Sequence, residues 1–279
     1  MGGPADFFSE PQNTEELIAI WSMALAEKVE ISVLAGGTNI LIADSGVRGL
    51  VISLKKLTGI EILENSKTLK FWAMSGTPKS ELLRLFLKHK LSAALFLAGL
   101  PGQVSGGVVM NAGVSEKIIP REFCEIVSGV EVLRPNGKIE FLDASQLNWS
   151  YRDCAGWQPG IITRVRFSVL NRPESTVVAE VKKLNQARLH KQPLEYPNGG
   201  SVFRNPIPLV AGKLVQDAGL KGYTIGGAQI SEKHGNFIVN KGGARARDIR
   251  ALIDMTISKV QNKFNVSLQT EIIFLGQFG

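Results

Sequence analysis

The chain has almost no cysteine. Only Cys124 and Cys154 occur among its 279 residues, and they do not form a Cys-x-x-Cys pair. Zinc sites and disulfide frameworks need clusters of such residues, so neither is indicated and we expect no bound metal. The sparing use of cysteine favours a reducing compartment, and the sequence therefore predicts a cytoplasmic protein.

Three ligand-binding motifs are also missing. The sequence contains no Gly-x-Gly-x-x-Gly fingerprint, no Gly-x-x-x-x-Gly-Lys-Ser/Thr loop and no His-Glu-x-x-His pair. These motifs mark dinucleotide-binding Rossmann domains, P-loop proteins and zinc proteases respectively. The sequence therefore gives no basis for any of the three folds.

No segment has the pattern of a membrane anchor or a secretion signal. The stretch 91–115 carries no charge, but Pro101 and five glycines would interrupt a spanning helix. The start, Met1-Gly-Gly-Pro-Ala-Asp6, lacks the basic and apolar parts of a signal peptide. We therefore expect a soluble protein that does not act in a membrane.

Glycine, by contrast, gathers in two charge-free segments, Ala35-Gly-Gly-Thr-Asn-Ile40 and the longer 98–113. A Gly-Gly pair alone is more often a tight turn. Two such segments, however, would let backbone N–H groups converge on the phosphate oxygens of one long ligand. A net charge of +7, from 32 Lys and Arg against 25 Asp and Glu, favours anionic partners. Together these features predict a backbone cradle for an anion.

Hydrophobic spacing predicts mixed helix and strand throughout. A capping pattern at Asn13 precedes the first expected helix, and Thr77-Pro78 is typical of the cap and first turn of another. Helices are expected over 14–27, after 78, from 177, and over 211–218 and 248–264. Strands are expected over 31–34, 40–43, 50–54, 69–74, 127–133, 138–142, 161–170, 236–240 and 268–275. The turn residues Pro135-Asn136-Gly137 predict a hairpin between 127–133 and 138–142. Turn residues near 171–175 predict two domains, 1–171 (with subdomains 1–56 and 57–171) and 172–279.

Longer sequence motifs, called strings below, include the glycine segments and continue into the second half of the chain. They are Gly36-Gly-Thr-Asn-Ile-Leu-Ile-Ala-Asp44, 46–52, 100–113, Tyr151-Arg152, Gln192-Pro193, 200–206, 211–222 and 226–240. In this order, and over essentially the whole chain, they resemble the UDP-N-acetylenolpyruvoylglucosamine reductases (MurB), in particular the compact subclass.

The resemblance implies an α+β fold, with an FAD-binding domain of the vanillyl-alcohol-oxidase (PCMH) type followed by a smaller α+β substrate-binding domain. It also implies an activity. NADPH reduces bound FAD, and a hydride then passes to the enolpyruvyl group of the UDP-sugar, which gives UDP-N-acetylmuramate for peptidoglycan synthesis. The UDP-sugar and NADPH are the expected partners, with neither nucleic acid nor an obligate protein partner.

Carried over by motif, the resemblance places Arg152 and Glu271 at the substrate carboxylate and Ser201 as proton donor to the carbanion. A guanidinium fork suits a carboxylate, and a hydroxyl is acidic enough because a carbanion is strongly basic. The implied FAD-binding residues are Gly36, Gly37, Thr38, Asn39, Gly102, Ser105, Gly106, Gly107, Asn111 and Gly113. The implied substrate-binding residues are Lys191 and Asn205 at the diphosphate, with His234 and Arg188 as weaker candidates.

Plainer interpretations and other classes of protein remain open. Arg152 could be a surface residue, Ser201 a turn former and Glu271 a solvent-facing carboxylate. A sugar or alcohol oxidase on the same FAD-binding half would keep residues 36–113 and need neither Ser201 nor Glu271. A basic nucleic-acid-binding protein is disfavoured, because no basic cluster is interleaved with aromatic residues.

The chain departs from the family pattern in three places. Its start, Gly2-Gly-Pro-Ala-Asp6, is short, which predicts weaker FAD binding. Cys154 stands where serine is usual, and we interpret it as a small core residue. Arg204 stands where lysine is usual. Neither Cys154 nor Arg204 removes a residue to which the resemblance gives a catalytic role.

Overall fold

The structure is a computed structural model that describes residues 2–114 and 118–278. The chain forms two compact units, each of which is discontinuous in sequence. Unit 1 contains the residues up to Asp6, then Thr38–Arg48, and the chain from Ala187 onward. Unit 2 contains Phe7–Gly37 and Gly49–Gln186. The early segment Thr38–Arg48 therefore belongs with the C-terminal third of the chain.

The first elements along the chain are short. They are β1 (Ala5–Ser9), α1 (Thr14–Ala26), β2 (Ile31–Leu34), β3 (Ile40–Ile42), β4 (Val47–Ser53) and the 3-10 turn η1 (Leu54–Lys56). The predicted cap of α1 is confirmed, because the Asn13 side chain accepts a hydrogen bond from the Glu16 N–H. Such a bond satisfies one of the N–H groups that a helix start leaves without a partner. Within unit 2, β2 pairs in parallel with residues 50–53 of β4.

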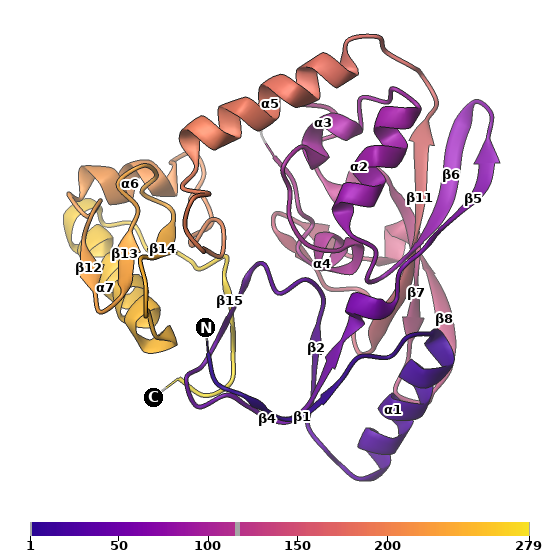
Figure 1. Ribbon diagram of the computed structural model, residues 1–279, viewed down its shortest axis with the longest axis horizontal. Coiled ribbons are helices and arrows are strands. Elements are labelled where there is room, and N and C mark those ends of the chain that lie inside the picture. The colour runs from indigo at the N-terminus through magenta and orange to yellow at the C-terminus, as the bar shows by residue number, and fades with distance from the viewer. Residues whose placement is uncertain (1, 115–117, 279) are drawn as a thin grey trace. The chain divides into compact units, whose positions relative to one another are not determined.

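A five-stranded antiparallel sheet forms the centre of unit 2 (Figure 1). Its order is β5 (Ile60–Asn65), β6 (Thr68–Met74), β11 (Ile161–Leu170), β7 (Val127–Leu133) and β8 (Ile139–Asp143). The predicted hairpin is confirmed, because β7 and β8 pair antiparallel with Val130 opposite Leu142. Two smaller strands, β9 (Trp149–Ser150) and β10 (Asp153–Cys154), form a separate hairpin, and 3-10 turns cover Phe123–Glu125 and Ala144–Gln146.

Helices α2 (Lys79–Lys88), α3 (Ala94–Leu97) and α4 (Val104–Val109) cover one face of this sheet (Figure 1). Aromatic side chains fill the space between, with Phe71, Phe86, Phe96, Phe123 and Phe167 fully buried in one cluster. Cys154 belongs to the same cluster, which confirms its interpretation as a core residue. Burial raises the pKa of its thiol to about 12, so it stays protonated and unreactive.

One local prediction in unit 2 was wrong. The Thr77 side chain does not cap α2, since its hydroxyl donates to the Gly59 carbonyl and accepts from the Gly59 N–H. The second glycine segment contains a helix, Val104–Val109, that was not predicted from the sequence. Glycine lowers helix propensity by only about 1 kcal/mol, and packing of Val104 and Val108 into the core outweighs that cost.

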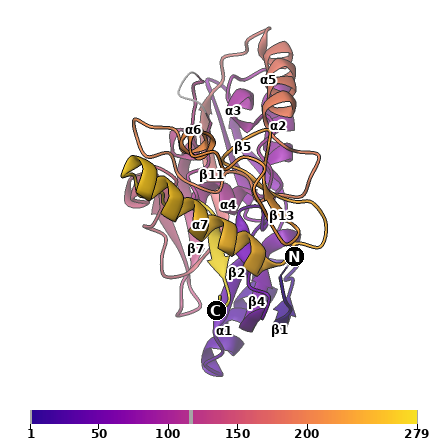
Figure 2. The ribbon, with the colours of Figure 1, turned by 90° about the vertical axis from the view of Figure 1, so that its left-hand side faces the viewer.

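Unit 1 contains a three-stranded sheet and two helices. The sheet order is β12 (Thr224–Ile225), β13 (Ala228–Ile230) and β14 (Ile238–Asn240). Helix α7 (Ala246–Phe264), the yellow helix in the foreground of Figure 2, packs on β12 and β13. The remaining elements are α6 (Ala211–Asp217) and the parallel pair β3 with β15 (Ile273–Leu275). Helix α5 (Val177–Lys191) precedes them and continues from unit 2 into unit 1.

The final strand is shorter than predicted. Only Ile273–Leu275 is a strand, whereas 268–272 forms single contacts with the chain near Val202. The apolar pattern alone cannot show this, because Leu268 and Ile272 are buried without a continuous partner strand. Among the helices described, none has both the length and the apolar character needed to cross a bilayer.

Gly107 tests how tightly α4 packs on the sheet. A Cβ atom at this position would overlap the ring of Phe123, which is fully buried. Gly107→Ala should therefore lower the free energy of unfolding by about 1–3 kcal/mol, the usual cost of overpacking. Gly106→Ala is the matched control, because its Cβ would meet only Ala35 Cβ at 3.4 Å. Urea denaturation should show the loss in the first variant alone, and equal midpoints would refute tight packing at Gly107.

Candidate active site

The two glycine segments contact each other inside unit 2. A Cβ on Gly36 would lie 2.8 Å from Gly102 Cα and 3.3 Å from the Gln103 nitrogen, which is closer than side chains approach a backbone. On the next turn of the second segment, Gly106 faces Ala35. Residues that are more than sixty positions apart in sequence therefore present adjacent backbone, as a shared cradle requires.

Hydrogen bonds fix the second segment to the end of β6. The Val104 N–H donates to the Thr77 carbonyl, and both the N–H and the hydroxyl of Ser105 donate to the Ser75 carbonyl at 3.0 Å. Within residues 2–114 and 118–278, the Ser75 hydroxyl and the Gln103 Oε1 are buried without a hydrogen-bond partner. Buried polar atoms of this kind are rare unless a ligand or water supplies the partner. This arrangement fits a polar ligand such as FAD.

Asn111 and Gly113, at the end of the second segment, connect to Arg152. The Asn111 amide donates to Glu122 Oε2 at 2.9 Å and to the Ser150 carbonyl at 3.1 Å, and its oxygen accepts from the Cys124 N–H. Arg152 Nη2 donates to the Gly113 carbonyl at 3.1 Å. The side chain of Asn111 is therefore engaged within the protein, and its predicted contact with FAD stays a prediction.

Arg152 is held rather than free at the surface. It lies between β9 and β10 with a left-handed backbone (φ 58), and its side chain is only 14% exposed. The guanidinium stacks on the Tyr151 ring, 4.9 Å from the centroid, and its Nη1 pairs with Glu122 Oε1 at 3.3 Å. This geometry disagrees with the solvated-surface interpretation of Arg152 and suits a fixed cation.

Ser201 and Glu271 lie on adjacent backbone segments of unit 1. The Glu271 N–H donates to the Val202 carbonyl at 2.8 Å, and Phe203 bridges to Thr270. Gly200 has φ 79, and its N–H donates to the Asn198 side chain, which forms the turn that leads into Ser201. The Asn39 amide donates to the Glu271 carbonyl at 2.8 Å. The structure thus brings together two predicted catalytic residues and one residue of the first glycine segment.

The predicted diphosphate residues are distributed around α6 and the end of α5. Asn205 Oδ1 accepts from the Ala211 N–H at 3.0 Å, and the His234 ring borders Gly212 in the same helical turn. Arg188 donates to Gln192 Oε1, whereas Lys191 is exposed. The structure therefore places Asn205 and His234 beside the first residues of α6, and it places Arg188 and Lys191 at the end of α5.

His234 is neutral at physiological pH. Burial, and to a lesser degree the positive charge of Lys221, lower the pKa of the imidazole below its ordinary value of 6.5. Its Nδ1 accepts a hydrogen bond from the Asn236 N–H at 3.2 Å, so Nε2 carries the proton. Without a bound anion, His234 can therefore offer a hydrogen-bond donor rather than a positive charge.

Sequence reasoning missed two residues that organise these segments. Asn236 is buried, and it accepts from the Phe203 N–H at 2.9 Å and donates to the Phe203 carbonyl at 2.8 Å, just beyond Ser201. Glu122 is the ion-pair partner of Arg152. The only available signal for Asn236 was its place inside the string 226–240, and Glu122 lies outside every string.

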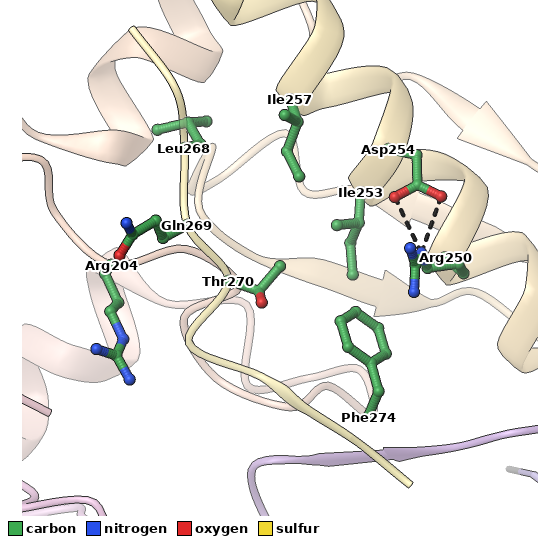
Figure 3. A pocket seen from close by; sticks show the side chains of 9 residues that line it. All are labelled: Arg204, Arg250, Ile253, Asp254, Ile257, Leu268, Gln269, Thr270 and Phe274. Atoms are coloured by element: carbon green, nitrogen blue, oxygen red, sulfur yellow. Dashed lines mark hydrogen bonds and ion pairs between the residues drawn. The ribbon is translucent and has the colours of Figure 1, made fainter. Parts of the chain in front are cut away.

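A separate pocket of about 500 Å³ opens between α7 and the 268–274 segment (Figure 3). Its wall includes Arg250, which forms two hydrogen bonds with Asp254 and stacks over Phe274. Arg204 is the only residue of the string 200–206 that lines this pocket. The predicted catalytic residues do not line it, so we do not assign it to the chemistry.

Two matched family models define the class of protein, the two-domain flavoproteins. Residues 5–143 match the family model of an FAD binding domain, and residues 192–275 match that of the C-terminal domain of UDP-N-acetylenolpyruvoylglucosamine reductase. The predicted α+β fold of the PCMH type with a second, smaller domain is thereby confirmed.

Known relatives are similar along nearly the whole chain. Reductases of this name from Caldanaerobacter subterraneus subsp. tengcongensis and Clostridium botulinum are 38% and 37% identical over 278 residues. These matches cover 99% of this chain and 89% and 88% of the relatives. The crystal structure of the reductase (MurB) from Thermus caldophilus matches with a TM-score of 0.80 and 31% identity, over 96% of this chain and 92% of that one. The chain belongs to the UDP-N-acetylenolpyruvoylglucosamine reductase family, and it is a flavin-dependent oxidoreductase.

Gly36 tests the contact between the two glycine segments. Gly36→Ala would force the backbones of Gly36 and Gly102 apart. The atoms that the new Cβ would meet are Gly102 Cα and the Gln103 nitrogen, and backbone atoms cannot move aside as the end of a flexible side chain can. We expect the dissociation constant for FAD to rise about tenfold or more, as a strain of 1–3 kcal/mol predicts. Flavin absorbance of the purified protein and titration of the apoprotein with FAD measure this.

The control for this experiment is Gly199→Ala in unit 1, where a Cβ would make only ordinary contact with Ile272. It should retain the FAD content of the wild type. Unchanged FAD affinity in Gly36→Ala would show that the close approach of the two segments has no part in cofactor binding.

Proposed function

We propose that the protein catalyses the NADPH-dependent, FAD-mediated reduction of UDP-N-acetylenolpyruvoylglucosamine to UDP-N-acetylmuramate, a step in peptidoglycan precursor synthesis. Family membership over 99% of the chain carries this proposal. The contact between Gly36 and Gly102 supports it, because that contact lies inside the matched FAD-binding domain. We place the reaction in the cytoplasm, where the free thiols of Cys124 and Cys154 would persist.

The proposed division of labour follows the predicted domains. Residues 1–171 bind FAD, and residues 172–279 bind the substrate. The two matched family models support this division, since one ends at residue 143 and the other begins at residue 192. The division concerns function and differs from the two compact units, because Thr38–Arg48 groups with the C-terminal third of the chain.

The residues present fit FAD. When bound, it would supply the acceptor for a hydride from NADPH and the donor of a hydride to the enolpyruvyl double bond. The cradle proposed to hold it is Gly36, Gly37, Thr38, Asn39, Gly102, Ser105, Gly106, Gly107, Asn111 and Gly113. Its backbone N–H groups suit the diphosphate, and the unpartnered Ser75 hydroxyl and Gln103 oxygen suit polar atoms of such a ligand.

Three side chains are proposed to bind the substrate carboxylate and to supply the proton. Hydride addition at the β-carbon of an enolpyruvyl carboxylate leaves negative charge on the α-carbon and the carboxylate. Arg152 is proposed to bind this carboxylate with its guanidinium, and Glu271 to lie beside it. Ser201 is proposed to donate its hydroxyl proton to the α-carbon, which completes the net addition of two hydrogens.

The sugar diphosphate is proposed to contact Lys191 and Asn205, with His234 and Arg188 as further contacts. Lysine and arginine supply positive charge, whereas neutral His234 supplies a hydrogen-bond donor. Asn205 already accepts the Ala211 N–H through Oδ1, so its amide nitrogen is the atom that points toward a phosphate oxygen in this proposal.

The absorbance of the flavin distinguishes this reaction from that of an oxidase. Purified protein should be yellow and should bleach with NADPH in the absence of oxygen. Addition of the enolpyruvyl UDP-sugar should then restore the colour, with one equivalent of UDP-N-acetylmuramate formed per flavin. Colour that returns only with oxygen would instead identify an oxidase.

Ser201→Ala tests the proton donor. The change should leave bleaching by NADPH intact but slow the return of colour by about 10²- to 10⁴-fold, the usual contribution of a positioned acid. Stopped-flow absorbance measures both half-reactions. Ser258→Ala, an exposed serine on α7, is the control and should match the wild type. Equal losses in both half-reactions would remove Ser201 from this role.

A further inference from the structure

Arg152 occupies a turn that constrains its backbone. The two-residue connection between β9 and β10 places it at φ 58, a left-handed conformation that costs free energy for a residue with a side chain. Such a conformation persists only where surrounding contacts determine it. The backbone thus fixes the position of the Arg152 Cβ atom. The direction of the rest of the side chain depends on the groups around the guanidinium.

Those groups come from the end of the second glycine segment and from Glu122, which follows it. Arg152 Nη1 donates to Glu122 Oε1 at 3.3 Å and to the Asn111 carbonyl at 3.5 Å, and Nη2 donates to the Gly113 carbonyl. The Glu122 side chain is 24% exposed, so this ion pair is partly removed from water. Charged pairs in such surroundings hold a fixed geometry better than exposed pairs do.

Glu122 is itself oriented by Asn111. Its second oxygen, Oε2, accepts from the Asn111 amide at 2.9 Å, which leaves Oε1 to face Arg152. Asn111 is 2% exposed, and its amide also donates to the Ser150 carbonyl, two residues before Arg152. One buried amide therefore holds both the turn that carries Arg152 and the carboxylate that pairs with it.

We propose that Glu122, oriented by Asn111, is a positioning residue that sets the direction of the Arg152 guanidinium toward the substrate carboxylate. This rests on the proposed function of Arg152. A second carboxylate beside the cation lowers the net charge that the substrate meets, so its benefit must be geometric. An arginine has several rotatable bonds, and restricting them before the substrate binds lowers the entropy lost on binding.

Substitution with glutamine separates positioning from a general role in folding. Glu122→Gln keeps the size of the side chain and an oxygen for the Asn111 amide, but it removes the charge that faces Arg152. The control is Glu125→Gln, because Glu125 is three residues away and pairs with exposed Arg121 instead. Both variants should bind FAD and be reduced by NADPH at rates within about twofold of wild type, because Glu122→Gln keeps an oxygen that accepts from the amide of Asn111, a residue of the proposed FAD cradle.

Two ligands make the readout specific for the carboxylate. Binding is measured through the change in flavin absorbance on titration with the enolpyruvyl UDP-sugar or with UDP-N-acetylglucosamine, which lacks the enolpyruvyl carboxylate. Glu122→Gln should weaken binding of the enolpyruvyl UDP-sugar roughly tenfold to a hundredfold, the range expected for loss of a charge-assisted contact. It should leave the affinity for UDP-N-acetylglucosamine unchanged. Glu125→Gln should change neither. Equal weakening for both ligands, or none, would overturn the proposal.

A double-mutant cycle tests whether Glu122 acts through Arg152. In an Arg152→Lys background, Glu122→Gln should cause no further loss of affinity for the enolpyruvyl ligand, because the fork geometry is already gone. Additive losses would overturn the proposal. If Glu122→Gln does not fold, Glu122→Asp takes its place, since it keeps the charge but withdraws it by one methylene, and it must show the same selectivity for the enolpyruvyl ligand.

Failure of the proposed function gives a different result. In that case wild-type protein would not bind the enolpyruvyl UDP-sugar more tightly than UDP-N-acetylglucosamine, and its bleached flavin would not regain colour with the former. A wild type that passes both tests, combined with an unselective Glu122→Gln variant, would refute only the positioning role.

Discussion

The close approach of two glycine backbones is the constraint on which the proposed FAD cradle depends. Gly36 lies against Gly102 so tightly that no side chain fits between them. The contact aligns one segment that ends β2 with another that begins α4, and both expose backbone rather than side chains. Recognition by backbone N–H groups is insensitive to residue type except where a Cβ would intrude. The requirement for glycine is therefore local and strict.

The same first segment continues into the other unit. After Gly37 the chain forms β3, which pairs with β15, and Asp44 then accepts the Ala246 and Arg247 N–H groups at the start of α7. The negative charge of Asp44 also suits the positive end of the α7 dipole. A segment near the N-terminus thus completes the C-terminal fold, and this explains why unit 1 is discontinuous. The proposed functional division at residue 171 does not describe how the chain packs.

Prediction from sequence succeeded where the pattern is local. The cap at Asn13 and the hairpin around Pro135-Asn136-Gly137 follow from neighbouring residues, and the structure contains both. It failed where a distant partner decides the outcome. Thr77 bonds to Gly59 rather than capping α2, and residues 268–272, which were predicted as strand, form only single contacts near Val202. Glu122 could not be found from its surroundings in sequence, because its role depends on Arg152, thirty residues further on.

Four asparagines show why a search for acids and bases underestimates such a site. The side chains of Asn39, Asn111, Asn198 and Asn236 bond to backbone at Glu271, Ser150, Gly200 and Phe203 respectively. Each of these backbone positions is a proposed catalytic residue or lies within two residues of one. A short amide offers a donor and an acceptor with little conformational freedom, so it can hold a strained turn or an isolated strand. Because the sheets of unit 1 are short, side-chain amides replace much of the hydrogen bonding that a longer ladder would supply near Ser201 and Glu271. The proposed catalytic geometry therefore depends not only on charged residues such as Glu122 but also on side chains that carry no charge and titrate at no accessible pH.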